Sequence, residues 1–282
     1  MRTLQKIQIT DDSYPPLLRH IPRPPEILYC MGNSAALAHT PVVAVVGTRR
    51  ATRYGLETAR ELARDASNAG IAVVSGLALG IDAEAHEGAL EGRAPTIAVL
   101  GSGLEHIVPT TTRRLAMRIL ESGGAIVSEF EPSQEANAKT FPQRNRIIAG
   151  LSSATIVIEA PEKSGALITA RFALDFNRDV GAVPGEITSL RSQGTNRLLK
   201  EGAALIRSAD DIRELLGLAA GTIPLDIASE SDNNLLHLLE MPQDAETLVA
   251  ISGAPATEIL AALTRLELAG RIKNTGGIFH KL

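Results

Sequence analysis

The stretch Val42-Val43-Ala44-Val45-Val46-Gly47-Thr48-Arg49 joins a run of apolar residues to a loop of small residues that carries a cation. A short apolar run that ends in such a loop is typical of a strand buried on both faces. Similar runs alternate with amphipathic helical patterns across residues 41–217, so we predict an α/β fold with a parallel sheet covered on both faces. The other strands are predicted at these positions: Ile71–Val74, Ile97–Leu100, Ala125–Val127, Thr155–Ile158 and Val180–Val183.

The two flanks of this region have different patterns. Residues 1–40 contain the proline clusters Tyr14-Pro15-Pro16 and Pro22-Arg23-Pro24-Pro25, which favour an extended arm that packs on the main domain. Residues 218–230 are predicted to be a linker, and residues 231–282 a small winged-helix domain. The elements expected in that domain are helices at 235–239, 245–251 and 256–268, a helix stop at Gly270, and a hairpin turn at Gly276-Gly277.

The composition is that of an ordinary globular protein. The 282 residues are 44% hydrophobic and carry a formal net charge of -4, which argues against a generally basic nucleic-acid coat. The sequence shows no leader peptide and no membrane span, so we predict a cytoplasmic protein. The single cysteine, Cys30, excludes an intrachain disulfide and a multi-cysteine zinc site. We expect no bound metal.

The loops that follow the predicted strands contain a candidate anion site. Open parallel sheets bind ligands beyond the carboxyl ends of their strands, where loops meet helix N-termini. Small residues there allow close approach of the backbone to an anion, and close packing of helix on sheet is the alternative explanation. None of the loops has the dinucleotide fingerprint, so we expect no nicotinamide or flavin cofactor. The positions are Gly47 and Arg49 after the first predicted strand, Ser75 and Gly76 after the second, and Ser164 and Gly165 after the fifth.

The stretch Phe141-Pro142-Gln143-Arg144-Asn145-Arg146 opens an apolar helical pattern and follows Lys139. An aromatic ring offers a stacking surface to a base, and guanidinium and ammonium groups neutralise backbone phosphate, so the cluster favours single-stranded nucleic acid. Structural ion pairs of the arginines are the alternative. Arg144 and Arg146 lie two apart on a helix and cannot both face one ligand, so one should pair with a carboxylate such as Glu129 or Glu159.

Asp82 and His86 are candidates for acid–base chemistry, because they lie four residues apart on one predicted helix face. No nucleophile or third metal ligand stands at a matching position. A local hydrogen bond that orients the loop is therefore favoured over catalysis. We expect no catalytic residues and predict that the protein is not an enzyme.

Several longer motifs follow one another in order along the chain. They are Gly47-x-Arg49 with Tyr54-Gly55, Ser75-Gly-Leu-Ala-x-Gly-Ile-Asp-x-x-Ala-His86, Ser128-Glu129-Phe130, Phe141-Pro-x-Arg-Asn-Arg-Ile-Ile-Ala-Gly-Leu151, Glu159-Ala160, Ser164-Gly-x-Leu-Ile-Thr-Ala170, Pro184-Gly185 and Gly194-Thr-Asn196. Over residues 13–217 the chain resembles the DprA family of DNA-processing proteins, also called Smf. The resemblance implies a Rossmann-like, doubly wound, mostly parallel sheet.

The resemblance also implies a function. Members of the family bind and protect single-stranded DNA, form homodimers through the Rossmann-like domain, and help to load the recombinase RecA during natural transformation of competent cells. RecA and single-strand-binding protein are the protein partners expected on this basis. Together with the anion-site loops, the resemblance gives a predicted DNA-binding set: Arg49, Ser75, Gly76, Lys139, Phe141, Arg144, Asn145, Arg146, Ser164 and Gly165.

Two departures from the family limit what is carried over. Ile107-Val108-Pro109 stands where the family usually has a tyrosine before the proline, so a contact made by that ring is not expected. The sequence also runs almost directly into the predicted arm, so functions of the family's N-terminal helical domain are not expected.

Two other classes of protein fit parts of the pattern. A nucleotide-processing enzyme related to the cytokinin-activating phosphoribohydrolases is the main alternative, but Ser164-Gly165-Ala166-Leu167 replaces the Pro-Gly-Gly-x-Gly-Thr run of those enzymes. A winged-helix transcription regulator would need a basic third helix, whereas the predicted one carries Glu258, Arg265 and Glu267. We therefore expect the winged-helix domain to contact protein or to have an auxiliary role.

Overall fold

The structure is a computed structural model that describes residues 4–218, 235–236, 238–239, 241–252, 254–268 and 272–281. The chain divides into two compact units, Met1–Ala220 and Gly221–Leu282. The predicted linker, residues 218–230, lies outside the described residues except for Leu218. Within the described ranges, every helix is too short or too polar to cross a membrane.

The first unit is built on a sheet with the strand order β1-β2-β6-β5-β4-β3-β7-β8-β9. Neighbouring strands are parallel from β6 to β9, whereas β1–β2 and β2–β6 are antiparallel pairs. From β3 the chain winds outward to β6 and then crosses back to β7, which confirms the predicted doubly wound sheet. The strands are β1 (Leu4–Gln8), β2 (Ile27–Gly32), β3 (Val42–Val46), β4 (Ala72–Ser75), β5 (Thr96–Val99), β6 (Ala125–Ser128), β7 (Ala154–Val157), β8 (Asp179–Ala182) and β9 (Ala204–Leu205).

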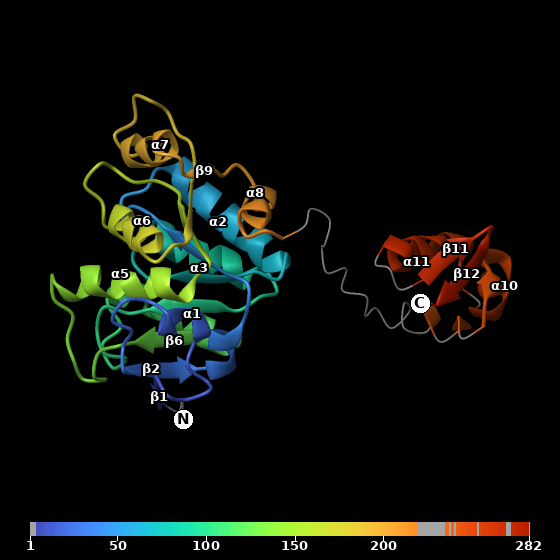
Figure 1. Ribbon diagram of the computed structural model, residues 1–282, viewed down its shortest axis with the longest axis horizontal. Coiled ribbons are helices and arrows are strands. Elements are labelled where there is room, and N and C mark those ends of the chain that lie inside the picture. Colours follow the sequence, from blue (N-terminus) through green and yellow to red (C-terminus); the bar gives the residue numbers. More distant parts are fainter. Residues whose placement is uncertain are drawn as a thin grey trace. The chain divides into compact units, whose positions relative to one another are not determined.

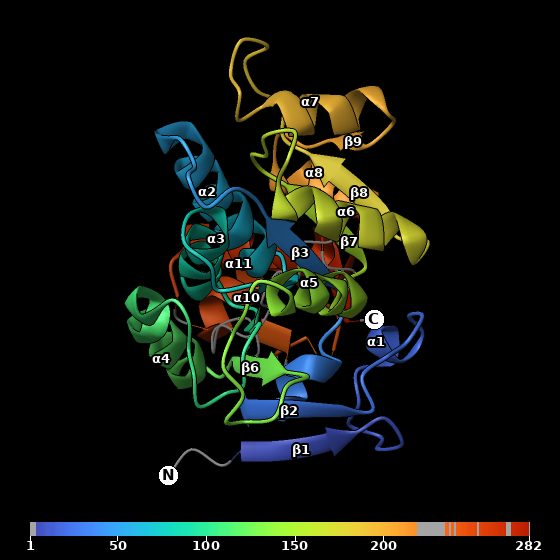
Figure 2. The ribbon, with the colours of Figure 1, turned by 90° about the vertical axis from the view of Figure 1, so that its left-hand side faces the viewer.

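Helices cover both faces of this sheet (Figure 1). Figure 2 shows α2, α3 and α4 on one side of the strands and α1, α5 and α6 on the other. The helices are α1 (Pro16–Arg19), α2 (Arg53–Asn68), α3 (Ile81–Leu90), α4 (Arg113–Glu121), α5 (Thr140–Leu151), α6 (Gly165–Asp175), α7 (Gln193–Lys200) and α8 (Ala209–Leu215), with 3₁₀ turns at Ser34–Ala38 and Thr110–Thr112.

The central strand β3 explains why the sequence pattern indicated burial on both faces. Val42, Ala44 and Val46 belong to the core beneath α5 and α6. Val43 and Val45 alternate with them and belong to the core beneath α2 and α3, as the period of two along a strand requires. Each of the six predicted strands agrees with the structure to within one residue.

The N-terminal region differs from the predicted extended arm. Strands β1 and β2 continue the main sheet, and β2 pairs with β6 so that Tyr29 lies opposite Ser128 and Cys30 opposite Val127. The apolar run after the proline clusters forms β2 and is buried in the core, because β2 pairs with the open edge of β6. The prolines lie in the connection between β1 and β2. They shape a loop, and residues 1–40 are part of the first unit.

Arg178 joins the end of α5 to this N-terminal region. Its Nη1 donates to the carbonyl oxygens of Ala149 at 2.8 Å and Gly150 at 2.7 Å, and also to that of Ser152. Its Nη2 donates to the carbonyl oxygen of Leu17 at 2.6 Å. The last carbonyls of a helix have no partner within the helix and attract a cation, so one guanidinium satisfies several of them.

Replacement of Arg178 by methionine is expected to lower the free energy of unfolding by about 2–4 kcal/mol. The change removes charge-assisted hydrogen bonds and leaves half-buried carbonyl oxygens without donors. Urea denaturation followed by circular dichroism measures the loss. Arg171→Met, at an exposed position of α6, is the matched control and should alter stability little. An Arg178→Met variant as stable as the wild type would show that these hydrogen bonds do not stabilise the fold.

The second unit has a three-stranded sheet in the order β10-β12-β11, and Leu248, Leu263 and Phe279 are among its buried residues. Gly276 and Gly277 join β11 to β12 with φ of 64° and 91°, values that favour glycine in a two-residue hairpin turn. The predicted winged-helix fold is confirmed. Residues 237 and 240, in and beside its first predicted helix, and Gly270, the predicted helix stop, lie outside the described residues. The elements are β10 (Gln243–Asp244), α10 (Ala245–Ser252), α11 (Ala256–Leu268), β11 (Ile272–Thr275) and β12 (Ile278–Lys281).

Candidate nucleic-acid interface

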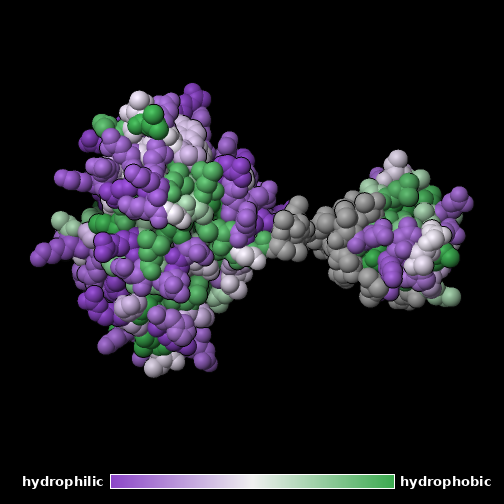
Figure 3. All heavy atoms as spheres, turned by 45° about the horizontal axis from the view of Figure 1, so that its top comes forward, coloured by the Kyte–Doolittle hydropathy of each residue, from purple (hydrophilic) through white to green (hydrophobic). Residues whose placement is uncertain are grey.

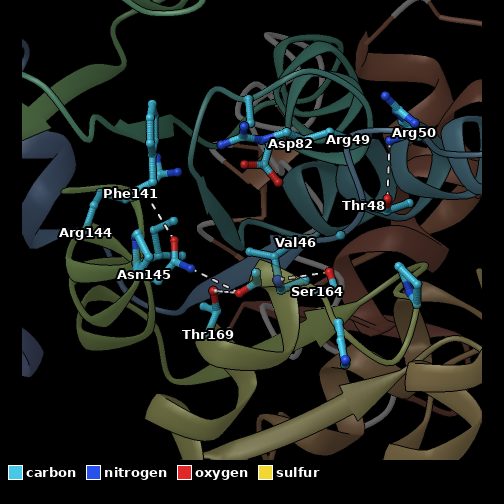
Figure 4. A pocket seen from close by; sticks show the side chains of 18 of the residues that line it. Val46, Thr48, Arg49, Arg50, Asp82, Phe141, Arg144, Asn145, Ser164 and Thr169 are labelled. Atoms are coloured by element: carbon cyan, nitrogen blue, oxygen red, sulfur yellow. Dashed lines mark hydrogen bonds between the residues drawn. The ribbon is translucent and has the colours of Figure 1, made fainter. Parts of the chain in front are cut away.

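A cavity of about 650 Å³ lies beyond the carboxyl ends of β3 and β7. These two strands are neighbours in the sheet, but the chain leaves them toward opposite faces, to α2 after β3 and to α6 after β7. Open α/β sheets bind ligands at such a switch point. The walls of the cavity come from the loops after β3 and β7 and from the first turns of α3, α5 and α6 (Figure 4).

Arg49 and Phe141 form the aromatic side of the cavity. The Cζ atom of Arg49 lies 5.0 Å from the centroid of the Phe141 ring, within the range of a cation–π contact. Gly101 lies against the ring, since a Cβ built on Gly101 would be 2.9 Å from Cδ1 of Phe141. The glycine loop after β5 therefore makes room for the ring. Arg49 is exposed, so the pair presents a flat, cationic surface to a ligand.

Arg144 forms a buried floor beneath this pair. Its side chain is 4% exposed, and Nη1 donates to the carbonyl oxygens of Gly76, at 2.6 Å, and Val99. Burial lowers the pKa of Arg144 to about 10, while the neighbouring Asp82 carboxylate opposes that shift. A Cβ on Gly76 would lie 2.4 Å from Nη1. Gly76 was predicted to contact DNA, and the structure instead shows it accommodating the Arg144 guanidinium.

The N-terminus of α6 forms the opposite wall. Ser164 caps this helix, because its Oγ accepts the N–H of Ala166 at 3.3 Å. Asn145 of α5 donates its side-chain amide to the carbonyl oxygen of Gly165 at 3.1 Å, which ties the two helices together. Lys163 precedes the cap and is exposed. The first N–H groups of the helix and this ammonium group favour an anion at the wall.

Glu159, one of the two carboxylates considered as partners for an arginine, instead fixes the loop that carries Arg49. Its carboxylate accepts the backbone N–H of Thr52 at 2.8 Å and the Thr52 hydroxyl at 2.5 Å. Its carbonyl oxygen accepts the N–H of Thr48 at 2.8 Å. The loop after β3 is therefore held by a residue that lies two positions beyond the end of β7.

The structure brings part of the predicted set together and leaves part of it elsewhere. Ser75 is fully buried and donates its hydroxyl to the carbonyl oxygen of Val45 at 2.6 Å, so its side chain is directed into the sheet and does not line the cavity as predicted. Lys139 is exposed at the start of α5 but does not line the cavity. The predicted residues that line it are Arg49, Phe141, Arg144, Asn145, Ser164 and Gly165.

Arg146 also lies away from the cavity. Its Nη2 pairs with the carboxylate of Glu129, and its Nη1 donates to the carbonyl oxygen of Arg23 at 2.8 Å. The predicted ion pair of one arginine with Glu129 is therefore confirmed, and Arg146, unlike Arg144, is not part of the cavity wall. The two arginines diverge because residues two apart on a helix face different directions.

The sequence analysis did not assign three charged residues of the wall to the site, namely Arg50, Lys163 and Asp82. In the sequence, neither Arg50 nor Lys163 differs from an ordinary surface cation. Asp82 was considered with His86 and not as part of an anion site. Its carboxylate faces the cavity beside Arg49 (Figure 4), and the residue is 7% exposed.

His86 is not an acid–base partner of Asp82. Its ring is fully buried, and Nδ1 lies 2.7 Å from the hydroxyl oxygen of Thr96, which donates its own hydrogen to the carbonyl oxygen of Val73. Nδ1 must therefore carry the proton and donate to Thr96, while Nε2 is buried without a partner. Burial, aided by the charge of Arg144, lowers the pKa of His86 to about 3. His86 is a neutral structural residue.

Stability is expected to decline as the pH falls below about 6.5, because the unfolded His86 takes up a proton. The folded imidazole stays neutral down to about pH 3. The contribution of neutral His86 to the free energy of unfolding is thus fully present above the pKa of the unfolded state. Below that pH it is lost by up to about 1.4 kcal/mol per pH unit. Urea denaturation at several pH values measures the slope. His86→Gln should flatten it, whereas His20→Gln, at an exposed site, should not. Equal slopes in all three proteins would contradict this assignment.

The fold and the cavity define a class of protein, the Rossmann-like α/β proteins with a cavity at the switch point of the sheet. Within this class the chain belongs to the DprA/Smf family. The family description DNA recombination-mediator protein A matches residues 5–217, and the DprA winged helix domain matches residues 228–277.

Individual relatives agree with this assignment. The Smf protein of Escherichia coli K12 is 37% identical over 288 aligned positions, which cover 98% of this chain and 77% of that protein. The crystal structure of DprA from Streptococcus pneumoniae superimposes with a TM-score of 0.71 at 38% identity, covering 75% of this chain and 74% of that one. DprA from Helicobacter pylori, solved in a study of its single-stranded DNA binding mode, has a TM-score of 0.67 at 32% identity and covers 77% and 98%.

Proposed function

We propose that this protein binds single-stranded DNA and acts as a recombination mediator, protecting incoming strands and helping to load RecA during natural transformation. The observation that carries the proposal is the Arg49–Phe141 pair next to the α6 N-terminus in one cavity. The pair suits a base, and the helix N-terminus with Lys163 suits a phosphate. A duplex holds its bases stacked and paired, so this combination favours a single strand.

The relatives and the charge distribution support the same conclusion. The Helicobacter pylori relative was studied for its binding of single-stranded DNA, and the family is one of DNA recombination mediators. The net charge of -4 restricts phosphate binding to a local site, and the cavity concentrates cations on a chain that is acidic as a whole. The role is one of binding, without catalysis, and its place is the cytoplasm.

Fluorescence anisotropy with a labelled oligo-dT tests the proposal. The wild-type protein should bind the single strand in preference to a duplex competitor, with a log–log salt slope of about -0.7 per phosphate contacted. Absent binding, or equal binding of both forms of DNA, would refute it. Nucleoside monophosphates would then be screened for hydrolysis, because a phosphoribohydrolase-like enzyme is the alternative on a related fold.

The proposal includes assembly with other proteins. A homodimer through the first unit is supported by Ile168 and Leu174 of α6, which are 40% and 58% exposed, since apolar side chains on a surface favour association. Figure 3 shows hydrophobic patches among the hydrophilic side chains of this unit. A solution mass of about twice 29.8 kDa at micromolar concentration is expected, and a monomeric mass would contradict it. RecA and single-strand-binding protein are the other proposed partners, and the winged-helix domain is proposed to contact protein.

A further inference from the structure

Asp82 is an anomaly in a cavity that otherwise favours anions. Its carboxylate lines the wall and has Arg144 and Arg49 as its neighbouring cations. A phosphate in contact with this carboxylate would be repelled. A metal ion is disfavoured there by the two guanidinium groups. The part of the cavity beside Asp82 therefore suits a neutral group with N–H donors.

The Asp82 carboxylate and the guanidinium groups beside it favour one base over the others. A carboxylate accepts only, and a guanidinium donates only. Their complement is an edge that has N–H groups next to a carbonyl oxygen. The Watson–Crick edge of guanine has this order, with N1–H and the N2 amino group beside O6. Thymine places a carbonyl oxygen on each side of its single N–H, and adenine and cytosine each offer one amino group beside an unprotonated ring nitrogen.

The surroundings of Asp82 also provide for stacking. Arg49 lies over the ring of Phe141 and next to the Asp82 carboxylate (Figure 4). Bases that are read on their Watson–Crick edges in single strands stack on aromatic rings and on guanidinium planes. The cavity volume of about 650 Å³ is within the range of small-molecule sites and accommodates a purine nucleotide.

We propose that the cavity holds one guanine of the bound strand, with Asp82 accepting from N1–H and the N2 amino group and an adjacent arginine donating to O6. This inference rests on the proposed binding of single-stranded DNA. It adds a base preference at one position to a site whose phosphate contacts are independent of sequence.

Anisotropy competition with oligo-dT strands that carry one substituted central base tests the inference on the wild-type protein. A single guanine should increase affinity about tenfold over thymine, as a two-bond contact to a base edge does. Hypoxanthine, which lacks the N2 amino group, should lose most of this gain, and N1-methylguanine should lose all of it. Equal affinities for all of these strands would overturn the inference and leave Asp82 as a counterion of Arg144.

A variant and a control complete the test. Asp82→Asn should reduce the ratio of guanine to thymine affinity to about one, because the carboxamide presents a donor where an acceptor is needed. Asp65→Asn, an exposed change on α2, should leave the ratio unchanged. If Asp82→Asn does not fold, the base series on the wild type still decides. Binding to oligo-dT without guanine preference overturns this inference alone, whereas failure to bind either strand overturns the proposed function as well.

Discussion

Arg49→Glu is expected to weaken binding of oligo-dT by at least about a hundredfold. Arg49 is exposed, lines the cavity and stacks on Phe141. The substitution removes a cation from the phosphate and base contacts and places a second carboxylate beside Asp82. A lost contact and an added repulsion of about 1.4 kcal/mol each would account for a factor of this size.

Two comparisons make the Arg49 experiment specific. Arg114→Glu changes the charge by the same amount at an exposed position of α4 outside the cavity, and it should alter affinity little at moderate salt. Lys139 is close in sequence to residues that line the cavity but is not part of the wall, so Lys139→Glu should weaken binding by an intermediate amount. If all three variants bind equally well, the cavity is not the DNA site. If all three lose binding equally, the affinity for DNA depends on the net charge of the protein and not on the geometry of the site.

Arg144→Met is expected to lower the free energy of unfolding by about 3–5 kcal/mol, the range found when one member of a buried charge pair is removed. The guanidinium is the donor to the carbonyl oxygens of Gly76 and Val99 and the cation beside buried Asp82. Methionine fills some of the space but supplies no donor and no charge. Urea denaturation measures the loss, and Arg113→Met on the surface of α4 is the matched control.

The loss in free energy of unfolding caused by Arg144→Met should become smaller as the pH falls. Burial raises the pKa of Asp82 above its usual value, and Arg144 partly offsets this, so its removal raises the pKa further. Folded Asp82 then binds a proton at a pH where the unfolded carboxyl, with a pKa near 3.9, is still ionised. Stability of the variant therefore rises relative to the wild type as the pH falls through this window. A penalty that is the same at about pH 5 and pH 8 would show that Asp82 is not the uncompensated charge.

The sequence was sufficient to predict the parts of the fold that depend on local pattern. The run Val42–Val46 predicted a strand buried on both faces because both sets of alternating residues are apolar. The first forty residues were harder, since Tyr14-Pro15-Pro16 and the later prolines suggested an arm. The pairing of Tyr29 and Cys30 with β6 depends on residues about a hundred positions away, which no local pattern contains.

The candidate site was predicted as a region, but the direction of each side chain was not. Arg144 and Arg146 have the same chemistry and differ in what lies opposite them. Arg144 meets a glycine 68 positions away, and Arg146 meets Glu129. Asp82 was not assigned to the site because its charge has the sign of the expected ligand. Once the structure shows which residues line the cavity, an acidic residue such as Asp82 can be assigned to it. Its negative charge then indicates that the ligand presents a hydrogen-bond donor at that position.

The antiparallel addition of β2 to β6 affects how the protein avoids aggregation. Strand β6 is buried and largely apolar, and an unpaired strand of this kind can pair with a strand of another molecule. With β1 and β2 in place, the outermost strand is β1, whose sequence Leu4-Gln5-Lys6-Ile7-Gln8 is partly polar and includes a lysine. Shortened versions of the chain that begin near Pro41 would expose β6 and should precipitate or form fibres, even though every residue that lines the cavity would still be present.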